Sequence, residues 1–420
     1  MRQVKPVKKI NATVHVPGSK SYTQRALIAA SLAKGRSFIR GALISEDTEY
    51  LIKALRLLGA TIGRKGSDLT VQGAGGKLTT PSRAIYLGNN GTALRLLTST
   101  ACLGHGTFFL DGDSRMQQRP IQPLVDALKK MGVRASCIKK NGCPPVEVHA
   151  KGLPGGKTSL AGGVSSQYLS SLLLAAPYAG KDTEIKLLGL LPSRPYVQMT
   201  LDVMARFGVE VSVSEDKFFL IKAPQAYRPG EYVVEGDVSS ATYFMAAAAI
   251  CGGTVSISNI NSASFQGDLR FLDILDTMGC RVTASGEGVK ITGPLCNHEE
   301  LSFDLHDVPD MVPALAVISA FRKGKTILKN IGHLRFKESD RIAALTHELR
   351  KIGAKAEERP HGMIVQGVAT HGAEIECSSD HRIAMSFAVA GLAIQGVFIK
   401  DPDCVRKSFP DFWEKLEALG

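Results

Sequence analysis

The sequence predicts an α/β fold made of six copies of one βαβαββ-type unit, grouped in two domains of three copies each. Three observations support this prediction: an amphipathic helix that ends in glycine recurs at regular intervals, a more apolar helix recurs between these helices, and paired strand patterns follow most of them. Self-similarity at a fixed period is typical of repeat architectures.

The amphipathic helix closes each copy with an apolar residue and a glycine, the residue expected just after a helix C-terminus. The segments read LRLLG, LKKMG, MARFG, LDTMG, LRKIG and LEALG. Their glycines follow one another at intervals of 67 to 76 residues: Gly59, Gly132, Gly208, Gly279, Gly353 and Gly420. Units of this size suit two domains of three units each.

A second helix in each copy has a polar head and a body that is apolar nearly all round, which predicts a buried helix. Its copies are GSKSYTQRALIAASLAKG, NNGTALRLLTSTACLGHG, VSSQYLSSLLLAAPYAG, GDVSSATYFMAAAAICGG, DVPDMVPALAVISAFRKG and SDHRIAMSFAVAGLAIQG. The heads contain serine, aspartate, asparagine, glycine and threonine, which are common at helix N-caps.

Strand–turn–strand patterns such as CRVTASGEGVKITG follow the first five amphipathic helices and predict β-hairpins. The sixth copy stops without a hairpin, and an extra strand-like segment, VKKINATVHV, precedes the first copy. We therefore expect residues 1–16 to join residues 233–420 in a discontinuous domain, and residues 17–232 to form an inserted domain. The active site is expected in the cleft between the two domains.

The chain has 420 residues and a net charge of +12, which favours anionic partners. Nucleic-acid binding is not expected, because the basic residues are spread out and aromatic residues, which stack on bases, make up only 6%. No apolar run suits a membrane span and no signal-peptide pattern is present, so we expect a cytoplasmic protein. None of the eight cysteines forms a CxxC pair, which argues against a zinc site.

The heads of the buried helices are the candidate binding site. The first N–H groups of a helix lack partners and carry a partial positive charge, so several such ends facing one cleft would attract anions. Basic residues at helix starts oppose the dipole, which a bound anion would explain. Such residues are Lys20, Arg25, Arg95 and Arg382. For Ser165, Ser239 and Asp380, plain helix capping is the alternative.

Asp310 begins a wholly apolar helix in HDVPDMVPALAV, where its carboxylate either caps the helix or accepts a proton among bound anions. Glu338 and His381 are further proton-transfer candidates. Glu338 lies in KESDRIAALTHELRKIG, an amphipathic helix that we expect to open with Lys337 to Arg341. The candidates for screening phosphate charge or donating protons are Lys20, Lys337 and Lys407.

The chain lacks the motifs of several common cofactors. PGSKS is not a GxxxxGK[ST] loop, GAGG does not extend to GxGxxG, and HExxH and DxDxDG do not occur. We therefore expect no cofactor and no metal, and a reaction of small anions that depends on charge placement and proton transfer.

Six segments, spread over almost the whole chain, carry a resemblance to a known family: PGSKSYTQRALIAASLAKG, GNNGTALRLL, MQQRPIQPLVDAL, GDVSSATYFMAAAAI, FKESDRI and SDHRIAM. They resemble the 5-enolpyruvylshikimate-3-phosphate synthases, a family of enolpyruvyl transferases. The resemblance implies a two-domain inside-out α/β barrel. It also implies transfer of the enolpyruvyl (carboxyvinyl) group from phosphoenolpyruvate to the 5-hydroxyl group of shikimate 3-phosphate, in chorismate and aromatic amino acid biosynthesis. We expect the protein to be a monomer.

The resemblance also implies site residues. Phosphoenolpyruvate would be bound by Lys20, Gly91, Arg119, Gln167, Arg341, Arg382 and Lys407. Shikimate 3-phosphate would be bound by Ser21, Arg25, Ser165, Ser166, Gln167, Ser193, Tyr196, Asp310 and Lys337. Asp310 is implied as the base at the attacking hydroxyl group, and Glu338 as the group that protonates the methylene carbon and later removes a proton as phosphate leaves. Whether Lys20, His381 or Lys407 shares the proton transfer stays open.

Three positions depart from the family pattern. Leu96 follows Arg95 where many relatives carry proline, and Asn90 replaces a common small residue before Gly91. His333 stands where many relatives carry asparagine, so it is not counted among the substrate ligands. Because Gly91 is kept, we expect inhibition by glyphosate, which Asn90 and Leu96 could weaken.

Two other functions fit parts of the pattern. The related UDP-N-acetylglucosamine enolpyruvyl transferases share the fold but usually carry a reactive cysteine near the arginine of QQRP, and DGDSRMQQRP contains none. A non-catalytic anion- or RNA-binding protein would use the positive charge, but it would not need Asp310 and Glu338 among the cations.

Overall fold

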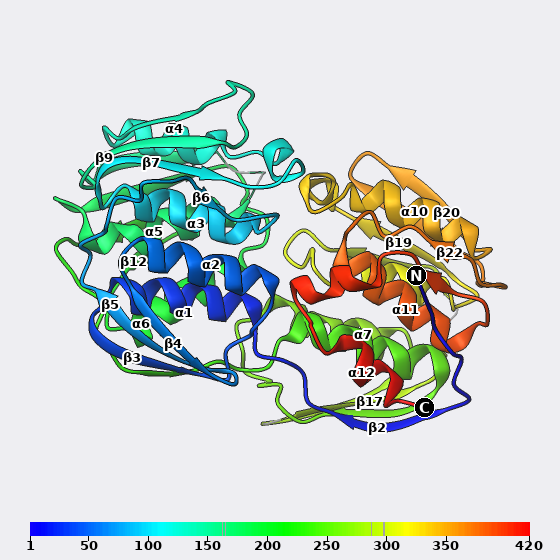
Figure 1. Ribbon diagram of the computed structural model, residues 1–420. Helices are drawn as coiled ribbons and strands as arrows, with labels where there is room; N and C mark the ends of the chain where they lie inside the picture. Colours follow the sequence, from blue (N-terminus) through cyan, green and yellow to red (C-terminus); the bar gives the residue numbers. More distant parts are fainter. Residues whose placement is uncertain (162, 164, 287, 297–298) are drawn as a thin grey trace. The chain divides into compact units, whose positions relative to one another are not determined.

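The computed structural model describes residues 1–161, 163, 165–286, 288–296 and 299–420. The chain divides into two compact units: unit 1 consists of Met1–Ser19 and Glu235–Gly420, and unit 2 of Lys20–Val234. Each unit contains three copies of one pattern of helices and strands (Figure 1). The prediction of an α/β fold is confirmed.

The second copy, in unit 2, shows the pattern most simply. In chain order it contains β6 (Ile85–Tyr86), α3 (Gly91–Ala101), β7 (His105–Asp111), α4 (Gln122–Lys130), β8 (Arg134–Cys137) and β9 (Val146–Lys151). The strand order is β6-β7-β9-β8, with β6 parallel to β7 and the other pairs antiparallel. α3 is buried on nearly every side, whereas α4 buries only one face.

The other two copies of unit 2 repeat this order. The first contains α1 (Lys20–Leu32), β3 (Lys34–Arg40), α2 (Glu46–Leu57), β4 (Thr61–Lys65), β5 (Asp68–Ala74) and, as its leading strand, β14 (Glu231–Val233). The third contains β10 (Gly156–Ala161), α5 (Ser166–Ala175), β11 (Thr183–Leu188), α6 (Pro195–Arg206), β12 (Ser212–Ser214) and β13 (Phe218–Ile221). Two short 3-10 segments are η1 (Met116–Gln118) and η2 (Ala176–Tyr178).

Unit 1 holds the fourth, fifth and sixth copies. The fourth contains β2 (Ile10–Val14), α7 (Val238–Cys251), β15 (Gly253–Ile257), η3 (Gly267–Leu269), α8 (Arg270–Thr277), β16 (Arg281–Ser285) and β17 (Gly288–Gly293). The fifth contains β18 (Leu301–Asp304), α9 (Val312–Ser319), β19 (Lys325–Lys329), η4 (Gly332–Phe336), α10 (Arg341–Lys351), β20 (Lys355–Arg359) and β21 (Gly362–Gln366). The sixth contains β22 (Glu374–Ile375), α11 (His381–Ala393), β23 (Phe398–Ile399), η5 (Pro402–Lys407), α12 (Phe412–Glu417) and β1 (Arg2–Gln3).

The N-terminal segment supplies strands to two sheets of unit 1. β2 pairs in parallel with β15, and β1 pairs in antiparallel fashion with β23. β1 thus takes the place of the hairpin that the sixth copy lacks. The β2–β15 pairing needs glycine at position 253, because a Cβ atom there would lie 2.0 Å from the Ile10 carbonyl oxygen.

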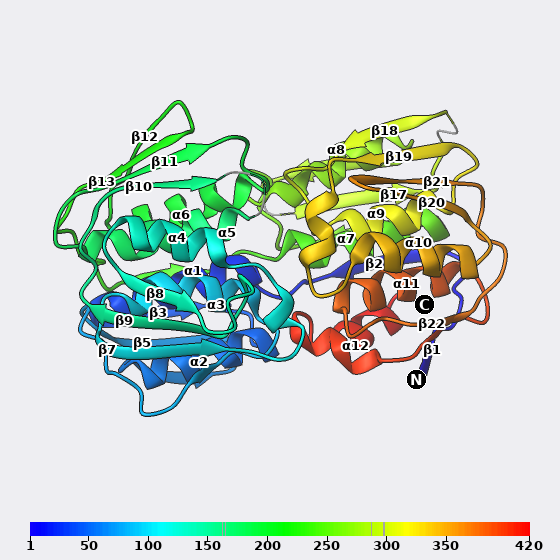
Figure 2. The ribbon, with the colours of Figure 1, turned by 90° about the horizontal axis from the view of Figure 1, so that it is seen from above.

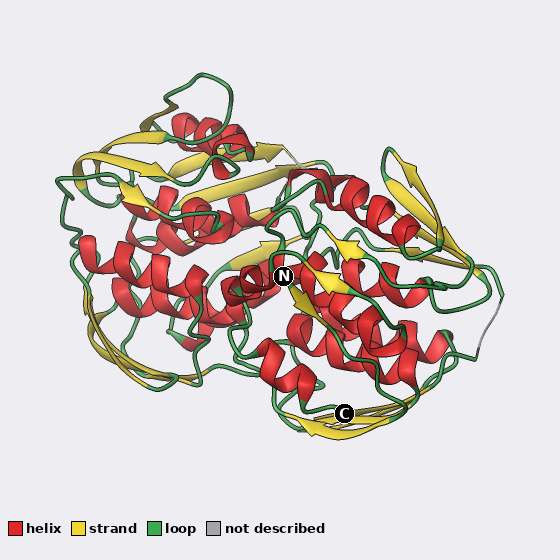
Figure 3. Cartoon of the chain, turned by 45° about the vertical axis from the view of Figure 1, so that its right-hand side comes forward, coloured by secondary structure: helices red, strands yellow, loops and turns green. Residues whose placement is uncertain are grey.

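In each unit the sheets lie around a bundle of helices (Figures 2 and 3). The helices predicted to be buried are α1, α3, α5, α7, α9 and α11, and the structure buries them: every residue of α9 is buried, as are the residues of α11 from His381 to Leu392. Each unit has its own hydrophobic core. The apolar bodies of these helices are packed in the core. Their polar first turns are therefore the parts that can bind a ligand without disturbing the packing.

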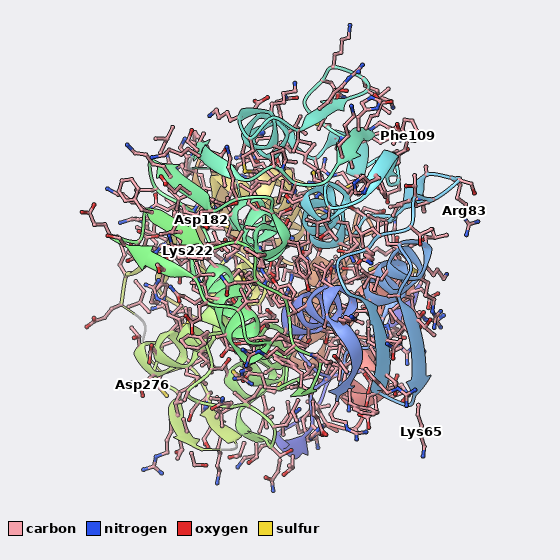
Figure 4. The ribbon with its side chains drawn as sticks, turned by 90° about the vertical axis from the view of Figure 1, so that its left-hand side faces the viewer. Lys65, Arg83, Phe109, Asp182, Lys222 and Asp276 are labelled. Carbon is pink, nitrogen blue, oxygen red and sulfur yellow. The ribbon has the colours of Figure 1, made fainter. Side chains whose placement is uncertain are left out.

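Many charged side chains lie on the outer faces of the sheets rather than at the helix starts. Asp182, just before β11, and Lys222, just after β13, form an exposed ion pair of 2.8 Å, and Lys65 extends from the end of β4 (Figure 4). Such pairs contribute little to stability. No helix in the described part of the chain has the length and apolar character of a membrane span.

Candidate active site

In unit 1 the amino-terminal ends of the three buried helices lie together. Arg382, in the first turn of α11, donates hydrogen bonds from Nη2 to Asp310 Oδ2 at 2.8 Å and from Nη1 to the Tyr243 hydroxyl group at 3.3 Å. Asp310 lies two residues before α9, and Tyr243 lies in the second turn of α7. One guanidinium group therefore links the starts of α7, α9 and α11.

Asp310 does not cap its helix. The N-cap position of α9 is Met311, which makes no side-chain capping bond. The Asp310 carboxylate instead accepts hydrogen bonds from Arg382 and, at 3.3 Å, from Arg341 Nη1. Of the two interpretations of this residue, capping is thus wrong, and the geometry is that of a carboxylate among cations.

Arg341, the first residue of α10, is 1% exposed and contacts three carboxylates. Its Nε lies 2.8 Å from Asp380 Oδ2, and its Nη2 lies 2.8 Å from Glu338 Oε2. Burial lowers the pKa of Arg341, but the charges of Asp380, Glu338 and Asp310 outweigh this effect and raise it. We call Asp310, Glu338, Arg341, Asp380 and Arg382 the carboxylate–arginine cluster.

The helix that we expected to open with Lys337 to Arg341 begins only at Arg341. Asp340 is its N-cap and accepts a hydrogen bond from the backbone N–H of Ala343 at 3.1 Å. Aspartate competes well for this position, because its short side chain satisfies an N–H group of the first turn. Lys337 and Glu338 therefore precede the helix, although Glu338 still contacts Arg341.

Asp380 has two roles at once. It caps α11 by accepting a hydrogen bond from the backbone N–H of Arg382 at 3.0 Å, and it accepts a second one from Ser339 Oγ at 3.0 Å besides those from Arg341. Next to it, His381 is wholly buried, with Nδ1 3.8 Å from Asp380 Oδ1. Lys407 is buried at the end of η5, which packs against α11.

His333 lies in η4, before Lys337. Burial lowers the pKa of His333 to about 3, and the positive charge of Lys337 and the neighbouring His306 lower it as well. The imidazole ring is therefore neutral at neutral pH. Its Nε2 atom is buried and has no hydrogen-bond partner among the residues that the structure describes.

Asp268 is a residue that the sequence analysis missed. It is buried in η3, and the Ser239 hydroxyl group donates a hydrogen bond to its Oδ2. Burial raises the pKa of Asp268 to about 7, and the charge of Asp310 adds to this rise. In the sequence, QGDLRF resembles an ordinary helix start, and only the tertiary structure shows that the carboxyl group is buried. Helix capping was one of two alternatives for Ser239, and it is wrong, because Asp237 caps α7.

In unit 2, Arg25 is a buried cation without a carboxylate partner among the described residues. Its Nε donates to Thr200 Oγ1 at 2.7 Å, and its Nη1 and Nη2 donate to the carbonyl oxygens of Ser21 and Tyr196 at 2.9 and 3.1 Å. Burial lowers its pKa to about 10. These acceptors are neutral, so the site keeps a positive charge that an anion can compensate.

A second arginine site of unit 2 surrounds the start of α3. Arg119 Nη1 donates to both oxygens of Asn89, the carbonyl at 3.0 Å and Oδ1 at 2.8 Å. Its guanidinium group covers Gly91, where a Cβ atom would lie 2.7 Å from Arg119 Cζ. Gln167, on α5, accepts a hydrogen bond from Arg95 Nη1 at 2.6 Å. The first turns of α3 and α5 are therefore joined by polar side chains.

Lys20 and Asn90 meet at Asp47. Lys20 Nζ lies 3.1 Å from Asp47 Oδ2, and Asn90 Nδ2 donates to the Asp47 carbonyl oxygen at 2.7 Å. Asn90 also caps α3 by accepting a hydrogen bond from the backbone N–H of Ala93 at 2.9 Å. The side chain of Asn90 is thus fully engaged within unit 2, and that of Leu96 is buried in its core.

The serine candidates of unit 2 lie at helix starts. Ser165 caps α5 by accepting a hydrogen bond from the backbone N–H of Gln167, and Ser166 is the first residue of that helix. Ser193 lies before α6 with φ of 60°, an unfavourable value for a residue with a side chain. Tyr196 follows in the first turn of α6, where its carbonyl oxygen contacts Arg25.

By their positions in the chain, the candidate residues fall into two groups, one in each unit. The group of unit 1 contains Asp310, Lys337, Glu338, Arg341, His381, Arg382 and Lys407. The group of unit 2 contains Lys20, Ser21, Arg25, Gly91, Arg119, Ser165, Ser166, Gln167, Ser193 and Tyr196. Among the described residues, no group of three or more histidine, cysteine, aspartate or glutamate side chains could hold a metal ion.

Comparisons with known proteins all indicate the same family. A family model described as EPSP synthase (3-phosphoshikimate 1-carboxyvinyltransferase) matches residues 4–416. The 3-phosphoshikimate 1-carboxyvinyltransferase of Syntrophobacter fumaroxidans is 43% identical, over 100% of this chain and 99% of that protein. The protein of the same name from Methanothermobacter thermautotrophicus is 45% identical, over 98% of this chain and 96% of that protein.

Solved structures agree with this. The structure of EPSP synthase from Acinetobacter baumannii has a TM-score of 0.81 and 28% identity, and the match covers 100% of this chain and 98% of that one. The enolpyruvyl transferase NikO from Streptomyces tendae has a TM-score of 0.80 over 100% of this chain and 97% of that one. At 19% identity, the second likeness concerns the fold alone.

Proposed function

We propose, since this chain belongs to the EPSP synthase (3-phosphoshikimate 1-carboxyvinyltransferase) family, that its two groups of candidate residues act together on one pair of substrates. The protein is an enolpyruvyl transferase. It transfers the enolpyruvyl group of phosphoenolpyruvate to the 5-hydroxyl group of shikimate 3-phosphate and releases phosphate. The reaction belongs to the shikimate pathway of chorismate and aromatic amino acid biosynthesis.

The carboxylate–arginine cluster is the observation that carries the proposed roles. Asp310 and Glu338 both contact Arg341, and neither carboxylate caps a helix. Carboxyl groups held among buried cations can exchange protons beside a bound anion, while the cations attract anionic substrates. A protein that only bound anions would gain nothing from these two carboxylates, which repel its ligand.

Shikimate 3-phosphate is bound through its phosphate and hydroxyl groups. Arg25 supplies a buried positive charge that lacks a carboxylate partner among the described residues, which supports a place for it beside the phosphate group. The other residues assigned to this substrate are Ser21, Ser165, Ser166, Gln167, Ser193, Tyr196, Asp310 and Lys337. Serine hydroxyl groups and helix N–H groups are suitable donors to phosphate oxygens.

Phosphoenolpyruvate carries a carboxylate and a phosphate group, and cations from both units surround it in this proposal. The residues assigned to it are Lys20, Gly91, Arg119, Gln167, Arg341, Arg382 and Lys407. Fixed cations offset the repulsion between two anionic substrates, and holding both in place removes much of the entropic barrier to their reaction.

The chemistry consists of an addition and an elimination. Asp310 takes the proton of the 5-hydroxyl group, whose oxygen bonds to C2 of phosphoenolpyruvate, while Glu338, in its protonated form, gives a proton to the methylene carbon C3. In the elimination the C2–O bond to phosphate breaks, Glu338 takes a proton back from C3, and the proton held by Asp310 passes to the departing phosphate group. Both carboxyl groups thus return to their starting states. His381, Lys20 and Lys407 are the candidates that could share these transfers.

Further parts of the proposal concern the whole protein. Each unit corresponds to one inside-out α/β barrel, and the cleft between the two domains forms the active site. The protein acts as a cytoplasmic monomer, takes glyphosate as an inhibitor, and needs no cofactor or nucleic acid. The buried first turns of the central helices support the proposed position of the active site, because helix N-termini favour bound anions.

Phosphate release with two alternative acceptors tests the function. We expect release from phosphoenolpyruvate with shikimate 3-phosphate and none with UDP-N-acetylglucosamine. Release with UDP-N-acetylglucosamine alone would assign the chain to the other enolpyruvyl transferases. No release with either acceptor would favour a protein that binds anions without catalysis.

A further inference from the structure

Asp268 is a buried carboxyl group that the proposed chemistry does not use. It lies in η3, between β15 and α8, and only 4% of it is exposed. Its Oδ2 accepts a hydrogen bond from the Ser239 hydroxyl group, whereas its Oδ1 is buried and has no hydrogen-bond partner among the described residues. A buried carboxylate with an unsatisfied oxygen is unfavourable unless a nearby charge compensates it.

Arg382 supplies such a charge. Ser239 and Tyr243 lie four residues apart on α7 and therefore on the same face of the helix. Ser239 contacts Asp268, and Tyr243 accepts a hydrogen bond from Arg382, which also contacts Asp310. Asp268 and Asp310, which come from different elements, thus both interact electrostatically with the guanidinium group of Arg382.

The charged groups that face Asp268 come from three elements: Asp237 at the start of α7, Asp310 before α9 and Arg382 on α11. On α8, which follows directly, Arg270 and Asp273 are exposed. Burial raises the pKa of Asp268 to about 7 and the charge of Asp310 adds to the rise, while Arg382 and the bond from Ser239 oppose it. Asp268 therefore changes its charge near neutral pH.

We propose that Asp268 is a positioning residue that tunes Asp310 through Arg382: once ionised, Asp268 offsets part of the arginine charge and raises the proton affinity of Asp310. This inference rests on the proposed role of Asp310 as the base. A carboxylate of higher proton affinity is a stronger base and takes the hydroxyl proton faster. The rate of the chemical step therefore rises as the pH passes through neutrality.

Single-turnover rates of phosphate release, measured from about pH 5.5 to about pH 9, test this. Asp268→Asn keeps the shape of the side chain but cannot ionise. We expect its rate to match that of the wild type at the acidic end and to be about threefold lower at the basic end, because a proton affinity raised about tenfold accelerates a proton transfer only in part. The ionisation of the substrate phosphates is common to all variants and cancels in the comparison.

Two further variants make the test specific. Ser239→Ala removes a hydrogen bond that favours the ionised form of Asp268, so the rise in rate moves to higher pH. Asp202→Asn changes an aspartate of α6 in unit 2 that pairs with Arg206, and as the matched control it keeps the wild-type profile.

A wild-type dependence of the rate on pH in Asp268→Asn overturns the inference. If Asp268→Asn does not fold, a rise in rate at the same pH as the wild type in Ser239→Ala overturns it instead. Asp310→Asn separates this inference from the proposed chemistry. If Asp310→Asn keeps its activity, both the proposed role of Asp310 as the base and this inference are wrong. If Asp310→Asn is inactive but Asp268→Asn has the wild-type dependence of rate on pH, only the inference is wrong.

Discussion

The Asp380 carboxylate holds the Arg341 guanidinium group along one edge: Oδ2 lies 2.8 Å from Nε, and Oδ1 lies 3.2 Å from Nη2. Both side chains are buried. Two parallel bonds fix the plane of the guanidinium group, which then also reaches Asp310 and Glu338. Because Asp380 caps α11 as well, the start of that helix and the orientation of the arginine depend on one carboxylate.

Arg341→Lys tests this geometry. An ammonium group keeps the charge but cannot make two parallel bonds or bridge three carboxylates. We expect the KM for phosphoenolpyruvate to rise about 10- to 100-fold and kcat to fall, because Glu338 loses its orientation. Arg350→Lys, at an exposed position of the same helix, is the control. Steady-state kinetics that are equal for the two variants would contradict this account of Arg341.

Arg25→Met removes the buried cation of unit 2 while keeping much of its volume. We expect the KM for shikimate 3-phosphate to rise at least about tenfold, because a charge-assisted bond to phosphate is lost. Shikimate 3-phosphate should raise the Tm of the wild type but not that of the variant. Arg36→Met, an exposed change on β3, serves as the control. Undiminished stabilisation of Arg25→Met by this substrate would exclude the assigned contact.

Glyphosate should inhibit the protein. Asn90 and Leu96, the two departures that could weaken inhibition, have side chains that are buried and engaged within unit 2. The group that faces Gly91 is the Arg119 guanidinium, whose Cζ would lie 2.7 Å from a Cβ atom at this position. An inhibition curve measured against phosphoenolpyruvate checks this, and a curve that stays flat to roughly millimolar glyphosate would contradict it.

The stability of Asp268→Asn relative to the wild type should depend on pH in a defined direction. The pKa of Asp268 is raised from 3.8 in the unfolded chain to about 7 in the folded protein. The folded state therefore holds a proton that the unfolded state loses, and its stability falls as the pH rises from about 4 to about 7. The variant lacks this loss of stability. The Tm of the variant minus the Tm of the wild type should therefore increase over this pH range. A Tm difference that is constant between about pH 5 and about pH 8 would contradict the assigned ionisation.

Much of the fold was predictable because the repeat is written in local patterns. Glycine after each amphipathic helix and the polar heads of the apolar helices lie within single segments of sequence, so they need no tertiary information. The same holds for the contact between Glu338 and Arg341, which are three residues apart. The predicted start of this helix at Lys337 was wrong, because Asp340 caps the helix and the helix therefore begins only at Arg341.

The rest of the site depends on distant segments. Nothing near Arg25 in the sequence shows that Thr200 supplies a neutral partner, and nothing near Asp268 shows that Ser239 and Arg382 surround it. A capping aspartate such as Asp380 also looks the same in sequence whether or not it holds an arginine. Burial decides the chemistry of these groups, and burial is a property of the packed fold.

The most direct test of the central claim is the rate of phosphate release by Asp310→Asn and Glu338→Gln with both substrates present. These changes keep the shape of each side chain but remove its ability to exchange a proton. We predict rates about 10²- to 10⁴-fold below the wild type, while shikimate 3-phosphate and phosphoenolpyruvate together still raise the Tm of each variant. Rates within about tenfold of the wild type would show that these carboxylates do not carry the proton transfers.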